Sequence, residues 1–116
     1  MDWARPVVHW ELRAKDPAKQ RDFYAAMFNW NIGDGAIMGI PAGVGGPDPG
    51  FLTGHIIPRD ASAFVLYIQV RDLRASMERA KELGGSVTQE PFDVPNGPTL
   101  AGIADPEGNA VMLVQQ

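Results

Sequence analysis

The clearest structural signal in the chain is the nine-residue stretch HWELRAKDP, residues 9–17. Apolar and polar side chains alternate along it, which predicts a strand over residues 7–14. The stretch closes with Asp16 and Pro17, a capping aspartate followed by a proline at the first helical position, so a helix should begin there. Because strand side chains alternate between faces, one face is polar and carries His9, Glu11 and Arg13.

A second strand–helix pair begins half a chain later. Residues 64–70 alternate in the same way, and Asp72 starts a helix that should end at Gly84. When the sequence is shifted by 56 residues, Asp16 aligns with Asp72. This shift is close to half of the chain length of 116 residues. We therefore expect one α+β domain over residues 1–116, built from two βαβββ modules at about residues 5–60 and 61–116. A single ferredoxin-like βαββαβ unit is the alternative, and it needs only two strands between the helices.

Composition removes several classes of protein. The chain has no cysteine, which excludes disulfides, thiolate nucleophiles and cysteine metal sites, and its only histidines are His9 and His55. A net charge of −4 without a basic run argues against a nucleic-acid partner. Neither a secretory signal nor an 18-residue apolar run occurs, so we expect no membrane partner and a cytoplasmic protein.

Several phrases of the sequence, taken together, resemble the vicinal oxygen chelate superfamily, which includes glyoxalase I, bleomycin-resistance proteins and extradiol dioxygenases. The resemblance covers nearly the whole chain. It implies two modules that form a curled mixed sheet around a cavity, and a homodimer. The phrases that carry it are HWELRAKDP, Phe23-Tyr24, Phe28-Asn29-Trp30, Tyr67-Ile68-Gln69-Val70-Arg71-Asp72, Leu83-Gly84-Gly85 and Asp105-Pro106-Glu107-Gly108-Asn109.

The resemblance also implies where a metal would bind. Members that use a metal place ligands on four strands, and His9 matches the first of these positions. Val65 and Met112 stand at two others, where an aliphatic side chain and a thioether are unsuitable for the divalent ions that the family uses. We therefore expect no metal and no cofactor. The alternative is a lyase, isomerase or dioxygenase with Zn, Ni, Mn or Fe held by His9, Glu11 and His55.

The expected function is the binding of a small molecule in the cavity. Arg13 matches the arginine that holds a substrate carboxylate in relatives of glyoxalase I, so a carboxylate-bearing ligand is expected. If the site is catalytic, Glu11 or His9 is the general base. The residues expected to line the cavity are His9, Glu11, Arg13, His55, Val65, Tyr67, Gln69 and Met112.

Less specific interpretations remain beside these. The polar face of the first strand could simply face solvent, His55 could be structural, and the chain could be an accessory domain without a ligand. The glycine-rich run Gly43–Gly50 is predicted to be a turn between strands. The aromatic residues after Asp16 are predicted to be core, namely Phe23, Tyr24, Phe28 and Trp30.

Overall fold

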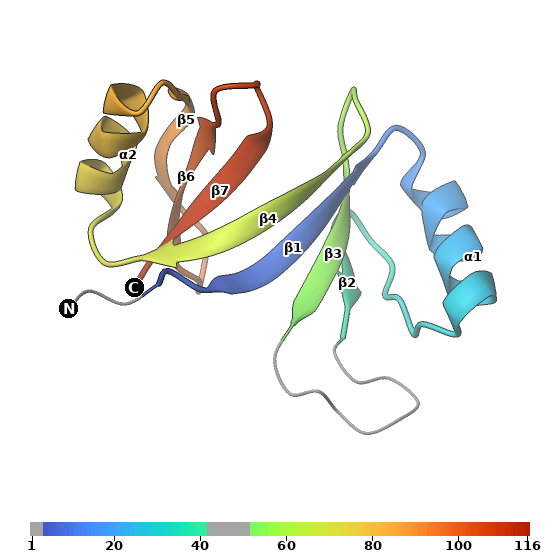
Figure 1. Ribbon diagram of the computed structural model, residues 1–116. Helices are drawn as coiled ribbons and strands as arrows, with labels where there is room; N and C mark the ends of the chain where they lie inside the picture. The colour runs from blue at the N-terminus through green and yellow to red at the C-terminus, as the bar shows by residue number, and fades with distance from the viewer. Residues whose placement is uncertain (1–3, 42–51) are drawn as a thin grey trace. The chain divides into compact units, whose positions relative to one another are not determined.

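The computed structural model describes residues 4–41 and 52–116, which form seven strands and two helices (Figure 1). The predicted turn Gly43–Gly50 lies outside these residues. Neither of the two helices described is long and apolar enough to cross a membrane. The elements are β1 (Val7–Ala14), α1 (Pro17–Phe28), β2 (Met38–Ile40), β3 (Thr53–Pro58), β4 (Ala63–Val70), α2 (Leu73–Glu82), β5 (Ser86–Asp93), β6 (Thr99–Ala104) and β7 (Ala110–Gln115).

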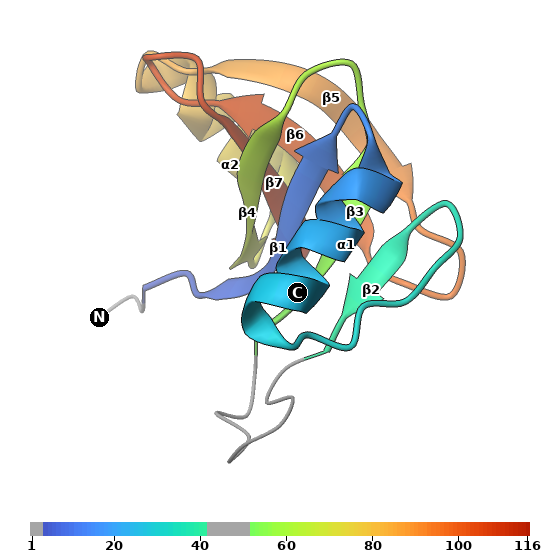
Figure 2. The ribbon, with the colours of Figure 1, turned by 90° about the vertical axis from the view of Figure 1, so that its right-hand side faces the viewer.

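The chain divides into two compact units, which we call the N-terminal unit, Val8–Val65, and the C-terminal unit, Leu66–Gln116 together with Met1–Val7. In the N-terminal unit the strand order is β2-β3-β1, with β3 parallel to β1 and antiparallel to β2. Helix α1 lies along these strands (Figure 2). Between α1 and residue 60, the end of the first expected module, the described residues form two strands, β2 and β3, where three were expected.

The apolar face of β1 forms the core of the N-terminal unit, as its alternation predicts. The buried residues are Leu12, Ala14, Met38, Ile40 and Ile56, with Trp10, Tyr24, Trp30 and Ile32 packed against them. The prediction for α1 is only half right, because the side chains of Phe23 and Phe28 are 54% and 53% exposed. Apolar residues surround this helix rather than forming one stripe, so they cannot all reach the sheet.

The C-terminal unit has the complete βαβββ order, which confirms the α+β class. Its strands are arranged β4-β7-β6-β5, with β4 parallel to β7 and the other pairs antiparallel, and α2 covers one face (Figure 1). Asp72 caps the helix by accepting a hydrogen bond from the Ala75 amide at 3.0 Å. Gln115 holds the same end, accepting from the Leu73 amide and donating to the Arg71 carbonyl. The core contains Val70, Leu73, Met77, Ala101 and Leu113.

The Asp-Pro-Glu-Gly segment forms the predicted turn between β6 and β7. One carboxylate oxygen of Asp105 accepts hydrogen bonds from the amides of Glu107 and Asn109, at 3.0 and 2.9 Å. Gly108 has a φ of 89°, which a glycine adopts without strain. The side-chain amide of Asn109 also donates to Asp105 Oδ2, at 3.0 Å. This side-chain bond is the main cause that lowers the pKa of Asp105, and the backbone amide of Asn109 is the second.

Candidate functional site

The polar side chains of the N-terminal unit gather on one face of β1 and β3. The two strands are parallel, with His9 opposite Thr53 and Glu11 opposite His55. Because neighbouring positions of paired strands point the same way, these residues and Arg13 share a face. On the opposite face of these strands Trp10 packs closely over Gly54. A Cβ atom at Gly54 would lie 2.2 Å from the Trp10 ring, so this position requires a glycine.

Five of these side chains form a continuous hydrogen-bonded series, which we call the polar row. Thr53 Oγ1 lies 2.9 Å from His9 Nδ1, and His9 Nε2 lies 2.7 Å from His55 Nδ1. His55 Nε2 lies 2.9 Å from Glu11 Oε1. The last bond runs from Arg13 Nε to Glu11 Oε2, at 2.6 Å. The polar row therefore uses all four imidazole nitrogens and both carboxylate oxygens.

Burial makes the polar row an unusual feature for a strand face. Glu11 is 2% exposed, whereas the side chains of His55 and Arg13 are 12% and 25% exposed. A buried carboxylate is costly unless it is paired, and the Arg13 guanidinium and the His55 ring supply that pairing. The interpretation of this face as solvated is therefore wrong for Glu11. Every buried side-chain nitrogen or oxygen in the described part of the chain has a hydrogen-bond partner.

The bonding pattern assigns the protons in the neutral polar row. An ionised Glu11 only accepts, so His55 Nε2 carries a hydrogen and His55 Nδ1 accepts one from His9 Nε2. The Thr53 hydroxyl then donates to His9 Nδ1. Burial lowers the pKa of His9, and the nearby His55 lowers it further, although Glu11 partly opposes both effects. The neutral imidazole of His9 is therefore favoured.

The polar row can gain one proton without losing a hydrogen bond. Protonated His55 would donate from both nitrogens, to Glu11 and to His9 Nε2. His9 would then carry its hydrogen on Nδ1 and donate to the Thr53 hydroxyl, which can accept as well as donate. The arrangement thus suits a group that takes up or releases a proton beside a buried carboxylate.

The same geometry does not fit a metal held by His9, Glu11 and His55. Two nitrogens bound to one ion at 2.0–2.1 Å would be roughly 3 Å or more apart, whereas the facing nitrogens of His9 and His55 are 2.7 Å apart. His55 also uses opposite ring nitrogens to reach His9 and Glu11, so the three side chains form a line rather than surround a point. No group of three or more suitable side chains in residues 4–41 and 52–116 is arranged to hold an ion.

The remaining predicted site residues are buried or half-buried. Val65 is 1% exposed at the start of β4, and Tyr67 and Met112 are 8% and 4% exposed. Tyr67 and Met112 are register partners of β4 and β7, so they are neighbours in the C-terminal unit. Gln69, two residues after Tyr67, is half-buried on the same side of β4. That these four residues line a cavity remains a prediction.

Sequence reasoning missed one member of the polar row, Thr53. Strand parity places it on the face of His55, two residues away, and that signal was available. What links it to His9 is the parallel pairing of β1 with β3.

Comparison with known proteins assigns the family. A family model described as a glyoxalase-like domain matches residues 9–114. The chain belongs to this family. The resemblance to the vicinal oxygen chelate superfamily is thereby confirmed, and solved structures with the same fold support it.

Several relatives of this glyoxalase-like chain share most of its length. Anthracycline biosynthesis protein DnrV of Streptomyces peucetius is 34% identical over 117 residues, which cover 93% of this chain and 41% of that protein. The chain thus spans less than half the length of this relative. Among solved structures, hypothetical protein BH1468 from Bacillus halodurans has a TM-score of 0.66 at 11% identity, over 98% of this chain and 96% of that one.

A methylmalonyl-CoA epimerase variant of Streptomyces coelicolor, solved in complex with 2-nitronate-propionyl-CoA, has a TM-score of 0.62 at 13% identity. The match covers 96% of this chain and 94% of the epimerase. At such identities, the likeness to the two solved structures shows the fold alone.

Proposed function

We propose that this glyoxalase-like chain binds a small organic molecule without a divalent metal, and that the polar row forms the polar part of the binding site. The proposal depends mainly on one observation: both ring nitrogens of His9 and both of His55 are in hydrogen bonds. The likeness to an epimerase solved in complex with 2-nitronate-propionyl-CoA supports a small-molecule ligand. The proposal keeps Val65, Tyr67, Gln69 and Met112 as ligand-binding residues, as the family resemblance implies.

The proposed ligand carries a carboxylate or a similar anion. Arg13 donates a hydrogen bond from Nε to Glu11. A guanidinium has further N–H donors, arranged in a planar fork that matches a carboxylate. A quarter of the Arg13 side chain is exposed, which leaves it accessible to a ligand. If the site is catalytic, Glu11 or His9 is its general base.

Two measurements on the purified chain test this proposal. Elemental analysis should find less than stoichiometric Zn, Ni, Mn and Fe. A thermal-shift screen of small carboxylic acids and their methyl esters should find acids that raise the midpoint, because a ligand that binds only the folded state stabilises it. Arg13→Gln should abolish the shift, and Arg21→Gln, which alters an exposed ion pair with Asp22, should not. Equal shifts by acid and ester would contradict the role of Arg13.

A second candidate function is a metal-dependent lyase, isomerase or dioxygenase. It is favoured by one observation, namely that His55 lies within hydrogen-bond distance of both His9 and Glu11. Both rings would have to rotate before one nitrogen of each could face an ion. A stoichiometric divalent metal that disappears in His9→Ala would establish this function in place of the first.

The proposal also includes a homodimer, which the family resemblance implies, and a location in the cytoplasm. Light scattering on the purified chain tests the dimer, and a monomer at working concentration would remove it.

A further inference from the structure

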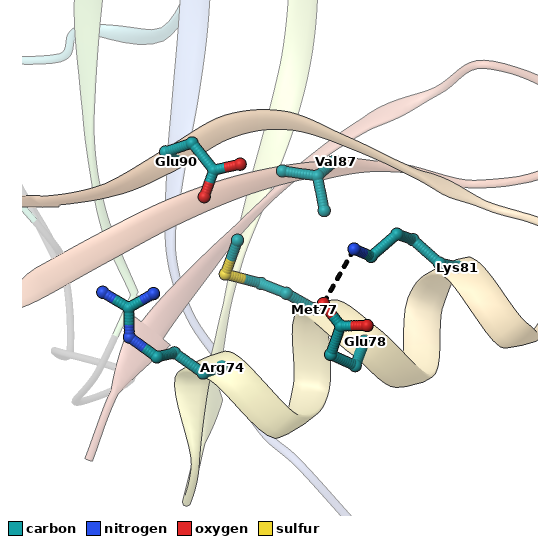
Figure 3. A pocket seen from close by; sticks show the side chains of 6 residues that line it. All are labelled: Arg74, Met77, Glu78, Lys81, Val87 and Glu90. Atoms are coloured by element: carbon teal, nitrogen blue, oxygen red, sulfur yellow. Dashed lines mark ion pairs between the residues drawn. The ribbon is translucent and has the colours of Figure 1, made fainter.

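Helix α2 of the C-terminal unit has a hollow on each side, and the two differ in charge. The hollow towards β5 is small, about 170 Å³, with Met77 and Val87 at its base (Figure 3). Two basic and two acidic side chains surround it, and Lys81 Nζ already pairs with Glu78 at 2.7 Å. Because its charges balance and part of them are paired, this hollow favours no particular ligand.

The second hollow is larger and mainly positive; we call it the arginine groove. It measures about 670 Å³, within the range of small-molecule pockets. Arg5, Arg71 and Arg79 line it. Among the described lining residues the one carboxylate is Asp72, which already accepts a hydrogen bond as the cap of α2. The lining of the groove therefore has three guanidinium groups and one carboxylate, and Arg79 also pairs with Glu82.

Apolar side chains line the arginine groove between these charges. Leu113 of β7 is buried, Ile103 of β6 is half-buried, and Leu83 after α2 is 62% exposed. An exposed leucine beside a partly covered isoleucine offers apolar area that a ligand can remove from water. The groove thus combines apolar contact with a positive rim.

We propose that the arginine groove is a second binding site, for a small amphipathic anion with an apolar ring or chain and one carboxylate, sulfonate or phosphate. Arg79 is well placed to hold the anion. It donates to Glu82 at 3.3 Å, and both side chains are more than 60% exposed, so this pair is weak and a ligand can displace it. The site uses no residue of the polar row and stands independently of the function proposed above.

The probe for this site is anilinonaphthalene sulfonate, whose fluorescence rises in apolar surroundings, and phenylnaphthylamine is its uncharged counterpart. The folded chain should bind the sulfonate about three- to tenfold more tightly than the amine, as expected for one charge-assisted contact. Arg79→Gln should remove that preference. The matched control is Arg74→Gln, on the same helix but at the smaller hollow, which should leave the preference unchanged.

Three results would overturn the proposal: no binding of the sulfonate, equal binding of both probes, or an equal loss in Arg79→Gln and Arg74→Gln. The midpoint of thermal unfolding should be measured for both variants. The Arg79 side chain is 64% exposed, so its substitution should not change the fold. Leu83→Ser supplies a second test, because it should weaken both probes while keeping the preference for the anion.

Discussion

Nε2 of His9 lies 2.7 Å from Nδ1 of His55, although 46 residues separate the two in the sequence. One hydrogen bond therefore joins the only two histidines of the chain. On one side of this bond His9 contacts the exposed hydroxyl of Thr53, and on the other side His55 contacts the buried carboxylate of Glu11.

The Thr53→Val substitution should move the chemical shift of His9 Nδ1, because it removes the hydroxyl that lies 2.9 Å from this nitrogen. A histidine-selective ¹H–¹⁵N NMR spectrum measures the change. Thr99→Val, which removes an exposed hydroxyl bonded to Asp93, is the control. An unchanged Nδ1 shift of His9 in Thr53→Val would show that this bond is not made in solution.

The Glu11→Gln substitution should lower the free energy of unfolding by about 2–4 kcal/mol, because it leaves the partly buried Arg13 without its counter-charge. Chemical denaturation measures the loss. Glu82→Gln breaks an exposed pair with Arg79 and should change stability by less than about 0.5 kcal/mol. The double variant Glu11→Gln, Arg13→Met should recover part of the loss. Equal effects of the two single variants would contradict the burial of this pair.

Gly54→Ala should destabilise the N-terminal unit by about 1–3 kcal/mol, the usual effect of overpacking. The added Cβ atom would overlap the Trp10 ring, and one of the two elements would have to move. Gly39→Ala on neighbouring β2 is a matched control, because a Cβ atom there meets nothing within 4 Å. Thermal unfolding of both variants makes the comparison. Similar midpoints would show that Trp10 does not lie over Gly54.

Stability should fall as the pH drops below about 6.5, the ordinary pKa of histidine. The folded chain lowers the pKa of His9, so the unfolded chain binds more protons between that lowered value and 6.5. The contribution of His9 to the free energy of unfolding is complete above pH 6.5. It is lost as the pH falls through the pKa of His9 in the folded chain. Unfolding at several pH values between 7 and 5 measures the slope, which should be shallower in His9→Gln. An equal slope in both proteins would remove His9 as its source.

Local patterns in the sequence predict most of the fold. The alternation in residues 7–14 and the Asp16 cap specify β1 and the start of α1 without long-range information, and the structure matches both. The exposure of Phe23 and Phe28 could not be predicted, because it depends on how much of α1 the sheet can cover. A broad apolar pattern on a helix does not reveal which stripe packs.

The candidate site divides in the same way. Strand parity alone places His9, Glu11 and Arg13 on one face of β1. The partners of these residues come from β3, and the sequence does not reveal that β3 pairs in parallel with β1 in this register. A shift by one residue would turn His55 to the apolar face. The sequence alone therefore does not decide which face His55 occupies, and it does not bring Thr53 to His9.

The most direct test of the polar row is a histidine-selective ¹H–¹⁵N NMR spectrum recorded before and after adding one equivalent of Zn²⁺. The account predicts that both rings carry a hydrogen on Nε2 and that their nitrogen shifts stay unchanged with zinc. Stoichiometric shifts of His9 and His55 nitrogens that EDTA reverses would contradict it, because those nitrogens would then bind an ion instead of each other.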